Sequence, residues 1–264
     1  MGLFDGAKAA VAGNKAVQTH VAANKLAESG KPVEAKARYQ EALRLYEESV
    51  SLDIRVARVL ESYAVLLMRE GKFDRASEIL DRVESKVKLK EDEEFQHMLS
   101  RSICQWRTGQ LDAAIATIKR AGAKKMRGTV YTTLGVFLLD KAAQTGDFAE
   151  AQALNDKAMD YDDEDAATLD NVAQLDEMIA DDAQAKGEPE KAAEYRAKAL
   201  KYYRAAHKIK PRQITTIYYL ARMYHRAGED DKAREVLSVK DTLYFTAICP
   251  VTREMMDALA AEVG

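Results

Sequence analysis

The sequence predicts an all-α protein built from about six helix–turn–helix hairpins, and residues 214–237 show the pattern most clearly. Apolar side chains there recur at the i, i+3, i+4 and i+7 spacing of one helix face. They are Ile217, Leu220, Ala221 and Tyr224. Gly228 then interrupts the pattern, and glycine adopts the left-handed conformation that ends a helix without a Cβ penalty. A second apolar helical segment follows, so this stretch predicts one hairpin of two helices.

The same glycine signal recurs along most of the chain. The string Gly-x-x-x-x-Ala occurs six times, and successive glycines are 37 to 41 residues apart. The six copies are Gly30/Ala35, Gly71/Ala76, Gly109/Ala114, Gly146/Ala151, Gly187/Ala192 and Gly228/Ala233. A near-constant period of this length indicates a repeat array, in which each hairpin buries its apolar face against its neighbours.

Two side-chain patterns accompany these glycines. First helices carry a large residue, a leucine, a small residue and an apolar one, as in Tyr131, Leu134, Gly135 and Leu138. Second helices carry alanine, an aromatic residue and alanine, as in Ala35, Tyr39, Ala42 and in Ala199, Tyr203, Ala206. Over residues 15–237 these patterns resemble the tetratricopeptide repeat (TPR) family of non-catalytic helical-repeat proteins. The resemblance implies a right-handed superhelical solenoid whose first helices line a concave groove.

The spacing departs from the family pattern, because a TPR is about 34 residues long. Part of the excess lies between Gly135 and Gly146, where the fourth first-helix is about one turn longer. The fifth second-helix, residues 189–210, is also long. HEAT-type repeats, with periods near 40, are the rival architecture. The glycine and the alanine five residues later recur in all six copies and favour the TPR type.

We expect one repeat domain over residues 1–264. Residues 1–16 would extend the first helix, residues 17–237 would form six repeats, and residues 238–264 would form a connector and a capping helix. The run 243–248 is β-branched and aromatic, and we expect it to pack as a connector. The amphipathic stretch after Pro250 would cover the exposed end of the stack, which needs a polar outer face.

Composition favours a folded cytoplasmic protein. Apolar residues make up 47% of the chain and charged residues 31%, as in ordinary soluble domains. A net charge of −3 gives no bulk attraction to nucleic acid or to an acidic membrane. No apolar run approaches the ~18–20 residues that span a bilayer, and the N-terminus lacks the apolar segment of a signal peptide. Cys104 and Cys249 lie far apart in sequence and are predicted to be free thiols.

The chain lacks the residue patterns of catalysis and metal binding. Its histidines fall in different repeats without metal-ligand spacing. They are His20, His97, His207 and His225. The acidic run 160–165 lacks the glycine and the closing glutamate of a calcium loop. Phosphate-loop, dinucleotide-binding and nucleophile-elbow motifs are also missing. We therefore expect a protein that is not an enzyme and that uses no cofactor and no metal.

Charge is segregated along the second half of the chain. Residues 158–185 hold ten acids and no bases, whereas residues 186–212 hold nine bases and three acids. A further basic cluster spans residues 119–127. The simplest interpretation is that acidic and basic helix faces complement each other in solvent. The alternative is a nucleic-acid-binding regulator that uses the clusters at 119–127 and 186–212, although no aromatic stacking platform accompanies them.

The resemblance assigns partner binding to the first helices. By analogy with the family, the groove candidates are His20, Asn24, Glu61, Val65, Met68, Thr132, Thr133, Val136, Glu177, Met178, Asp181, Thr215, Tyr218, Tyr219, Arg222, His225 and Arg226. Each of them has packing against a neighbouring repeat as its alternative role. The expected function is a protein- or peptide-binding scaffold or adaptor, such as an assembly factor or a chaperone, whose partner the sequence does not identify.

One TPR subfamily grips the C-terminal carboxylate of heat-shock chaperones with lysine, asparagine and arginine side chains. Asn24 matches one of those positions, but His20 and Ser62 stand at two others. The carboxylate would lose most of its charged partners. We therefore expect that this chain does not bind chaperone tails.

Overall fold

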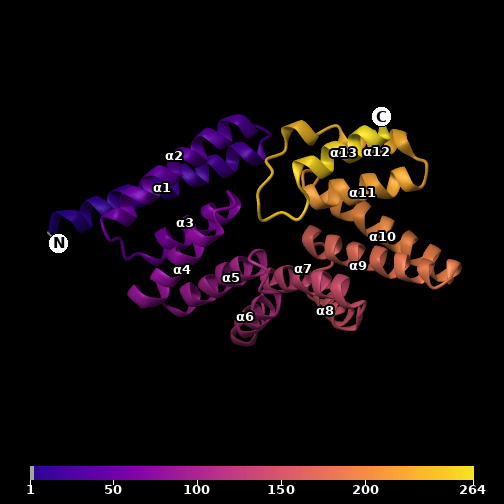
Figure 1. Ribbon diagram of the computed structural model, residues 1–264, viewed down its shortest axis with the longest axis horizontal. Coiled ribbons are helices and arrows are strands. Elements are labelled where there is room, and N and C mark those ends of the chain that lie inside the picture. The colour runs from indigo at the N-terminus through magenta and orange to yellow at the C-terminus, as the bar shows by residue number, and fades with distance from the viewer. Residues whose placement is uncertain (1–2) are drawn as a thin grey trace. The chain divides into compact units, whose positions relative to one another are not determined.

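Paired helices make up the computed structural model, which describes residues 3–264 and, within them, side chains from residue 6 onward. The pairs in chain order are α1 (Leu3–Glu28) with α2 (Pro32–Ser51), α3 (Ala57–Arg69) with α4 (Phe73–Lys86), α5 (Glu91–Arg107) with α6 (Leu111–Lys124), α7 (Gly128–Thr145) with α8 (Ala149–Tyr161), α9 (Ala166–Ala185) with α10 (Pro189–Ile209), and α11 (Ile214–Arg226) with α12 (Asp230–Leu237) (Figure 1). The short 3-10 helix η1 (Lys240–Thr242) and α13 (Arg253–Val263) follow. Six hairpins and a terminal helix confirm the predicted all-α fold class.

Each hairpin turns at its predicted glycine. The φ angles of Gly30, Gly71, Gly109, Gly146, Gly187 and Gly228 lie between 72° and 80°, in the left-handed region that favours glycine. Five of the turns carry the paired hydrogen bonds of a Schellman motif. In the first turn, for example, Lys31 N–H donates to the Leu26 carbonyl (2.9 Å) and Gly30 N–H donates to the Ala27 carbonyl (3.2 Å). The turn at Gly146 differs, because its N–H donates to the Ala142 carbonyl (2.8 Å).

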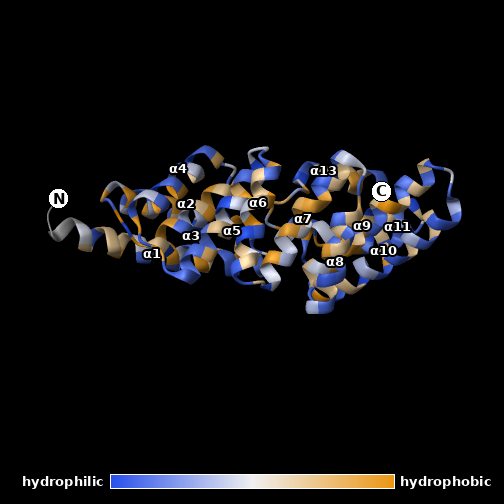
Figure 2. Ribbon diagram, turned by 90° about the horizontal axis from the view of Figure 1, so that it is seen from below, coloured by the Kyte–Doolittle hydropathy of each residue, from blue (hydrophilic) through white to orange (hydrophobic). Residues whose placement is uncertain are grey.

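The alanine five residues after each glycine is buried where the two helices of the hairpin meet. Ala35, Ala76, Ala114, Ala151, Ala192 and Ala233 are at most 3% exposed. Hydrophobic and hydrophilic residues alternate along each helix (Figure 2), as expected of helices that pack on one side. Each glycine of the repeated pattern therefore marks the turn of a hairpin, and the alanine five residues later marks the contact between its two helices.

Long helices account for part of the extended period. α7 has 18 residues, whereas α3 and α11 have 13 each. α9 has 20 residues and α10 has 21. α7 and α10 are the long helices that the sequence predicted, and α2 and α9, with 20 residues each, are long as well.

The described residues fall into two compact units. The first contains the residues up to Thr117 together with Thr242–Ile248, and the second contains Ile118–Asp241 together with Cys249–Gly264. α6 therefore contributes to both units. One repeat domain over residues 1–264 stays a prediction, and its residues 1 and 2 lie outside the described part of the chain.

Tyrosines and close helix contacts form the core of the first unit. Tyr39, Tyr46 and Tyr63 are at most 1% exposed, and the rings of Tyr46 and Tyr63 stack with centroids 5.1 Å apart. α1 and α2 approach so closely that a Cβ at Gly13 would lie 2.8 Å from Ser49 Oγ. Glycine is required there for lack of space.

The connector Thr242–Ile248 packs against the first unit. Ala247 N–H donates to the Arg69 carbonyl (2.8 Å), and the Tyr244 hydroxyl donates to Glu70 Oε1 (2.7 Å). The Tyr244 ring lies 4.9 Å from that of Tyr39. Through these contacts the aromatic run packs against α2 and α3.

α13 covers the last hairpin of the second unit. Met256, Leu259 and Val263 are at most 4% exposed, and α13 packs against α11 and α12. Arg234 Nη1 donates to the Val263 carbonyl (2.8 Å). The helix has the place and the amphipathic character of the predicted cap. Cys104 and Cys249 are free thiols, as predicted.

We predict that Ala233→Leu destabilises the last hairpin by ~1–3 kcal/mol, because Ala233 is 0% exposed and a larger side chain would overpack the helix contact. The measurement is the urea midpoint. Ala193→Leu, on an exposed position of α10, is the matched control and should leave the midpoint nearly unchanged. Equal midpoints for both variants would contradict the assigned hairpin contact.

Candidate functional site

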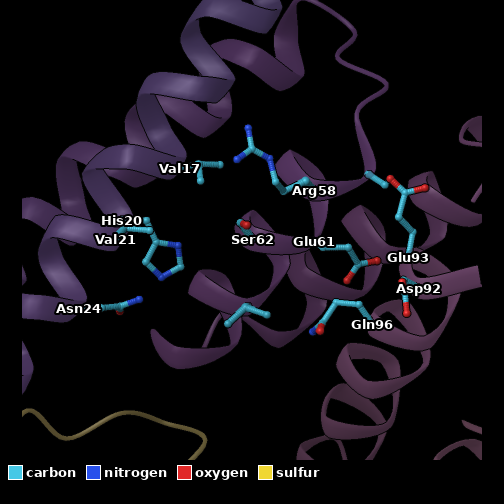
Figure 3. A pocket seen from close by; sticks show the side chains of 12 residues that line it. Val17, His20, Val21, Asn24, Arg58, Glu61, Ser62, Asp92, Glu93 and Gln96 are labelled. Carbon is cyan, nitrogen blue, oxygen red and sulfur yellow. The ribbon is translucent and has the colours of Figure 1, made fainter. Parts of the chain in front are cut away.

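A cavity of about 470 Å³ lies between α1, α3 and α5, the first helices of three successive hairpins. Its lining residues are Val17, His20, Val21 and Asn24 from α1, Ala57, Arg58, Glu61, Ser62 and Val65 from α3, and Asp92, Glu93 and Gln96 from α5. In Figure 3, His20 enters from the α1 wall, while Asp92 and Glu93 lie on the opposite side. The structure therefore brings together four of the expected groove residues, which are His20, Asn24, Glu61 and Val65.

Helical spacing explains why these side chains converge. On α1 the lining residues are separated by three, one and three positions, and Arg58, Glu61, Ser62 and Val65 on α3 repeat this pattern. Side chains at i, i+3, i+4 and i+7 share one helix face. The lining stripe runs beside the core stripe of each helix, which is why the sequence could identify it.

His20 is a neutral, buried member of this site. It is 6% exposed, and its Nδ1 lies 3.3 Å from the Tyr46 hydroxyl. Burial, assisted by the nearby Arg69 guanidinium, lowers the pKa of His20 to about 4. Its Nε2 is buried without a hydrogen-bond partner. The imidazole can therefore offer one ring nitrogen to a ligand.

Glu61 is a buried carboxylate with one oxygen engaged. It is 5% exposed, and its Oε1 accepts a hydrogen bond from His97 Nδ1 (2.6 Å). Its Oε2 is buried without a partner. The other ring nitrogen of His97 donates to Glu84 Oε1 (2.8 Å). Burial lowers the pKa of His97, but the hydrogen bonds to the two carboxylates outweigh it and raise the pKa above its usual value.

His97 is a residue that sequence reasoning missed, since its spacing to other histidines carried no signal. Its role depends on contacts with α3 and α4, which are distant in sequence. Among the residues that the structure describes, no cluster of histidine, cysteine or acidic side chains could hold a metal ion.

Asn24 in the cavity wall and Met68, two expected groove residues of the first unit, have structural roles. Asn24 Oδ1 accepts hydrogen bonds from the Tyr39 hydroxyl and from Arg69 Nη1, both at 2.7 Å. Met68 is 0% exposed, so its side chain belongs to the core and not to the open groove. It lies at the end of α3 where the connector packs, beside the Arg69 carbonyl that Ala247 N–H contacts.

In the second unit, the expected groove residues on α9 and α11 mostly contact one another. Glu177 is 3% exposed and accepts hydrogen bonds from the Tyr203 hydroxyl (3.1 Å), Arg222 Nη2 (2.8 Å) and Arg226 Nη1 (2.9 Å). The Arg222 guanidinium lies 4.7 Å from the centre of the Tyr219 ring. This buried carboxylate is fully engaged by its neighbours.

The remaining candidates are also engaged in local contacts. The Arg222 guanidinium lies 5.6 Å from the Tyr218 ring, and His225 Nδ1 donates to Asp230 Oδ1 (2.7 Å). Asp181 pairs with Arg226 (3.4 Å) and faces a separate cavity of about 480 Å³. Thr132 Oγ1 donates to the Gly128 carbonyl (3.2 Å) of its own helix. Thr133, like Thr132, is half-buried.

Asp170 is a buried acid that the sequence did not single out. It accepts hydrogen bonds from the Thr215 and Thr216 hydroxyls, both at 2.7 Å, and from Gln174 Nε2 (2.9 Å). Burial raises the pKa of Asp170 despite these bonds. The Asp170–Thr215–Thr216 contact ties α9 to α11 and gives Thr215 a structural partner.

Ion pairs engage several members of the basic clusters. Lys119 and Lys141 both contact Glu150, at 2.5 and 3.0 Å. Lys186 pairs with Asp182 (2.7 Å) and Lys198 with Glu194 (2.6 Å). The Lys186–Asp182 pair joins the acidic segment 158–185 to the basic segment 186–212, whereas Lys198–Glu194 lies within the basic segment. None of the described helices has the length and apolar content needed to cross a membrane.

The consecutive helix hairpins of the described residues define an α-helical repeat protein. Residues 63–125 match the family model described as tetratricopeptide repeat. The match runs from within α3 to the end of α6, so this stretch of the chain is similar to tetratricopeptide repeats. No curated protein matches the chain as a relative.

Solved structures share this fold at low sequence identity. The human IFIT1 dimer with PPP-AAAA has a TM-score of 0.61 at 18% identity, and the match covers 84% of this chain and 49% of that one. A tetratricopeptide repeat protein from Parabacteroides merdae has a TM-score of 0.52 at 13% identity, covering 95% and 86%. PilF from Pseudomonas aeruginosa has a TM-score of 0.51 at 14% identity, covering 94% and 99%. The matched region is about half the length of the IFIT1 chain.

We predict that His20 weakens the fold as the pH falls. Between about pH 6.5 and the folded pKa of about 4, His20 is protonated in the unfolded chain but neutral in the folded one. The free energy of unfolding therefore decreases as the pH falls through this range, by up to ~3 kcal/mol. The urea midpoint of His20→Asn should therefore fall less than that of the wild type between about pH 7 and about pH 4.5. Lys15→Asn, on the exposed side of α1, should follow the wild type. Parallel curves for wild type and His20→Asn would contradict the assignment.

We predict that Arg222→Ala destabilises the protein by ~1–3 kcal/mol, because it removes one partner of the buried Glu177 carboxylate. Arg226→Ala should cost less, since the Arg226 side chain is 49% exposed whereas that of Arg222 is 29% exposed. Urea unfolding of the two variants gives the comparison. An unchanged midpoint for Arg222→Ala would contradict its structural role and make Arg222 a candidate for partner binding again.

Proposed function

We propose that this chain is a non-catalytic cytoplasmic scaffold or adaptor that binds a protein or peptide segment along the first helices of its hairpins. An assembly factor or a chaperone would use such a groove. The TPR fold supports this function, because it exposes a row of first-helix faces of similar spacing. The proposal places the partner first in the cavity between α1, α3 and α5.

The observation that carries the proposal is the combination of this cavity with two buried polar atoms that have no partner. Glu61 Oε2 and His20 Nε2 belong to side chains that line it. A buried polar group without a hydrogen bond costs about 1–3 kcal/mol. A ligand that supplies the missing partners recovers part of that free energy, so these two groups favour an occupied groove.

The expected residues of the second unit belong to the same proposal with a smaller role. Thr132, Thr133, Glu177, Asp181, Tyr218, Tyr219, Arg222 and His225 lie along first helices α7, α9 and α11. Because Glu177 and Arg222 already pair with each other, a ligand would have to compete with that pair. We therefore assign the main anchoring contacts to the first unit.

A library of random peptides displayed on phage, selected on the purified full chain, tests the groove. Peptides recovered with the wild type should bind Val21→Trp at least about tenfold more weakly, because Val21 lines the cavity and is 48% exposed at its rim. Val11→Trp is the control, since Val11 lies on the same helix, is 69% exposed and is not part of the lining. Fluorescence anisotropy gives the affinities. Recovery of no peptide, or equal binding to both variants, would refute the proposed groove.

RNA is the alternative partner, because the IFIT1 structure that shares this fold was determined with PPP-AAAA. The basic clusters at 119–127 and 186–212 would supply its phosphate contacts. Binding of a fluorescent oligoadenylate, with and without a 5′-triphosphate, should then weaken steeply between about 50 mM and about 200 mM salt. The absence of binding at the lower salt concentration would remove this alternative.

A further inference from the structure

The cavity between α1, α3 and α5 has an excess of acidic side chains. Glu61, Asp92 and Glu93 line it, and Arg58 is the one lysine or arginine among the lining residues. Arg58 Nη2 donates to Asn14 Oδ1 (2.8 Å), so this cation has a partner on α1. His97 offsets part of the Glu61 charge through Oε1, but it is not among the lining residues. The charge balance favours a cationic ligand group.

The unpartnered oxygen of Glu61 requires that the ligand group donate a hydrogen bond. Glu61 is 5% exposed, and its Oε2 exposes less than 1 Å². An ionised carboxylate only accepts hydrogen bonds, so its missing partner is a donor. Little water competes at such a buried atom, which strengthens a hydrogen bond formed there. We expect the carboxylate to turn slightly toward the cavity when a donor arrives.

His20 completes the recognition without adding a repulsive charge. Its ring is neutral near pH 7, and when its proton is on Nδ1, facing the Tyr46 hydroxyl at 3.3 Å, Nε2 is an acceptor. A second acceptor thus lines the same cavity as the Glu61 oxygen.

An ammonium group fits these acceptors better than a guanidinium. A guanidinium binds a carboxylate best through two parallel bonds to both oxygens, and Glu61 Oε1 is already occupied by His97. An ammonium has three donors and acts as a compact point charge. The aliphatic part of a lysine can lie along Val17, Val21 and Val65, which line the same cavity.

From this arrangement we infer that the cavity between α1, α3 and α5 binds a lysine side chain of the partner peptide, with Glu61 Oε2 as the acceptor for its ammonium group. This inference rests on the proposed function and names the chemical class of its partner. The cavity of about 470 Å³ exceeds the ~30 Å³ share of one water many times, so it has room for the side chain and flanking peptide.

Positional-scanning peptide pools test the inference on the full chain. Each pool fixes one residue type at a central position and randomises the others. The lysine pool should bind the wild type about tenfold more tightly than the arginine, glutamine or methionine pools. Glu61→Gln should abolish that preference, because its amide turns an acceptor into a donor while it preserves the shape.

Glu84→Gln is the matched control. It removes the same charge from the other carboxylate bound to His97, but Glu84 does not line the cavity, so the lysine preference should persist. A second probe, butylammonium, should shift the NMR signals of the Val17, Val21 and Val65 methyls in the wild type more than butylguanidinium does.

The outcomes separate the inference from the proposed function. Peptide pools that bind without a lysine preference, or an arginine pool equal to the lysine pool, overturn the inference and leave peptide binding standing. A preference that survives Glu61→Gln also overturns it. Failure of every pool to bind overturns both the inference and the proposed peptide groove.

Discussion

The left-handed glycine at each hairpin turn is the constraint on which the rest of the structure depends. An L-residue pays roughly 1–2 kcal/mol to adopt that conformation, and glycine does not. The glycine ends one helix and reverses the chain, so the alanine five residues later lies in the contact between the two helices. Ala35 and Ala76, at 0% exposure, illustrate how little space remains there. Repeating this turn directs α1, α3 and α5 so that their matching faces line one cavity.

Features that depend on local sequence could be predicted, and features that depend on distant partners could not. Helix ends and buried alanines follow from the glycine and the helical spacing, and the resemblance to TPR proteins suggested the groove side for His20 and Glu61. The engagement of Glu61 by His97 depends on a residue 36 positions away, and the contact of Tyr244 with Glu70 spans 174 positions.

Each of the two units has a buried glutamate on a first helix, but the two carboxylates differ in how fully they are hydrogen-bonded. On α9 the buried carboxylate of Glu177 receives hydrogen bonds from Tyr203, Arg222 and Arg226. On α3 the buried carboxylate of Glu61 receives one from His97 and keeps an oxygen without a partner. A ligand gains little from a carboxylate whose partners it must displace. The physical difference between the units therefore favours the first as the binding end.

The two histidines near Glu61 show how the fold prepares this site for a cation. Hydrogen bonds to Glu61 and Glu84 raise the pKa of His97, so a positive charge lies where it compensates a buried carboxylate. Burial keeps His20 neutral on the cavity side. If His20 had the carboxylate neighbours of His97, it would carry a positive charge on the cavity side, and this charge would repel an incoming ammonium group. The opposite shifts thus leave the Glu61 oxygen without a cationic neighbour from His20, as the proposed binding of a lysine side chain needs.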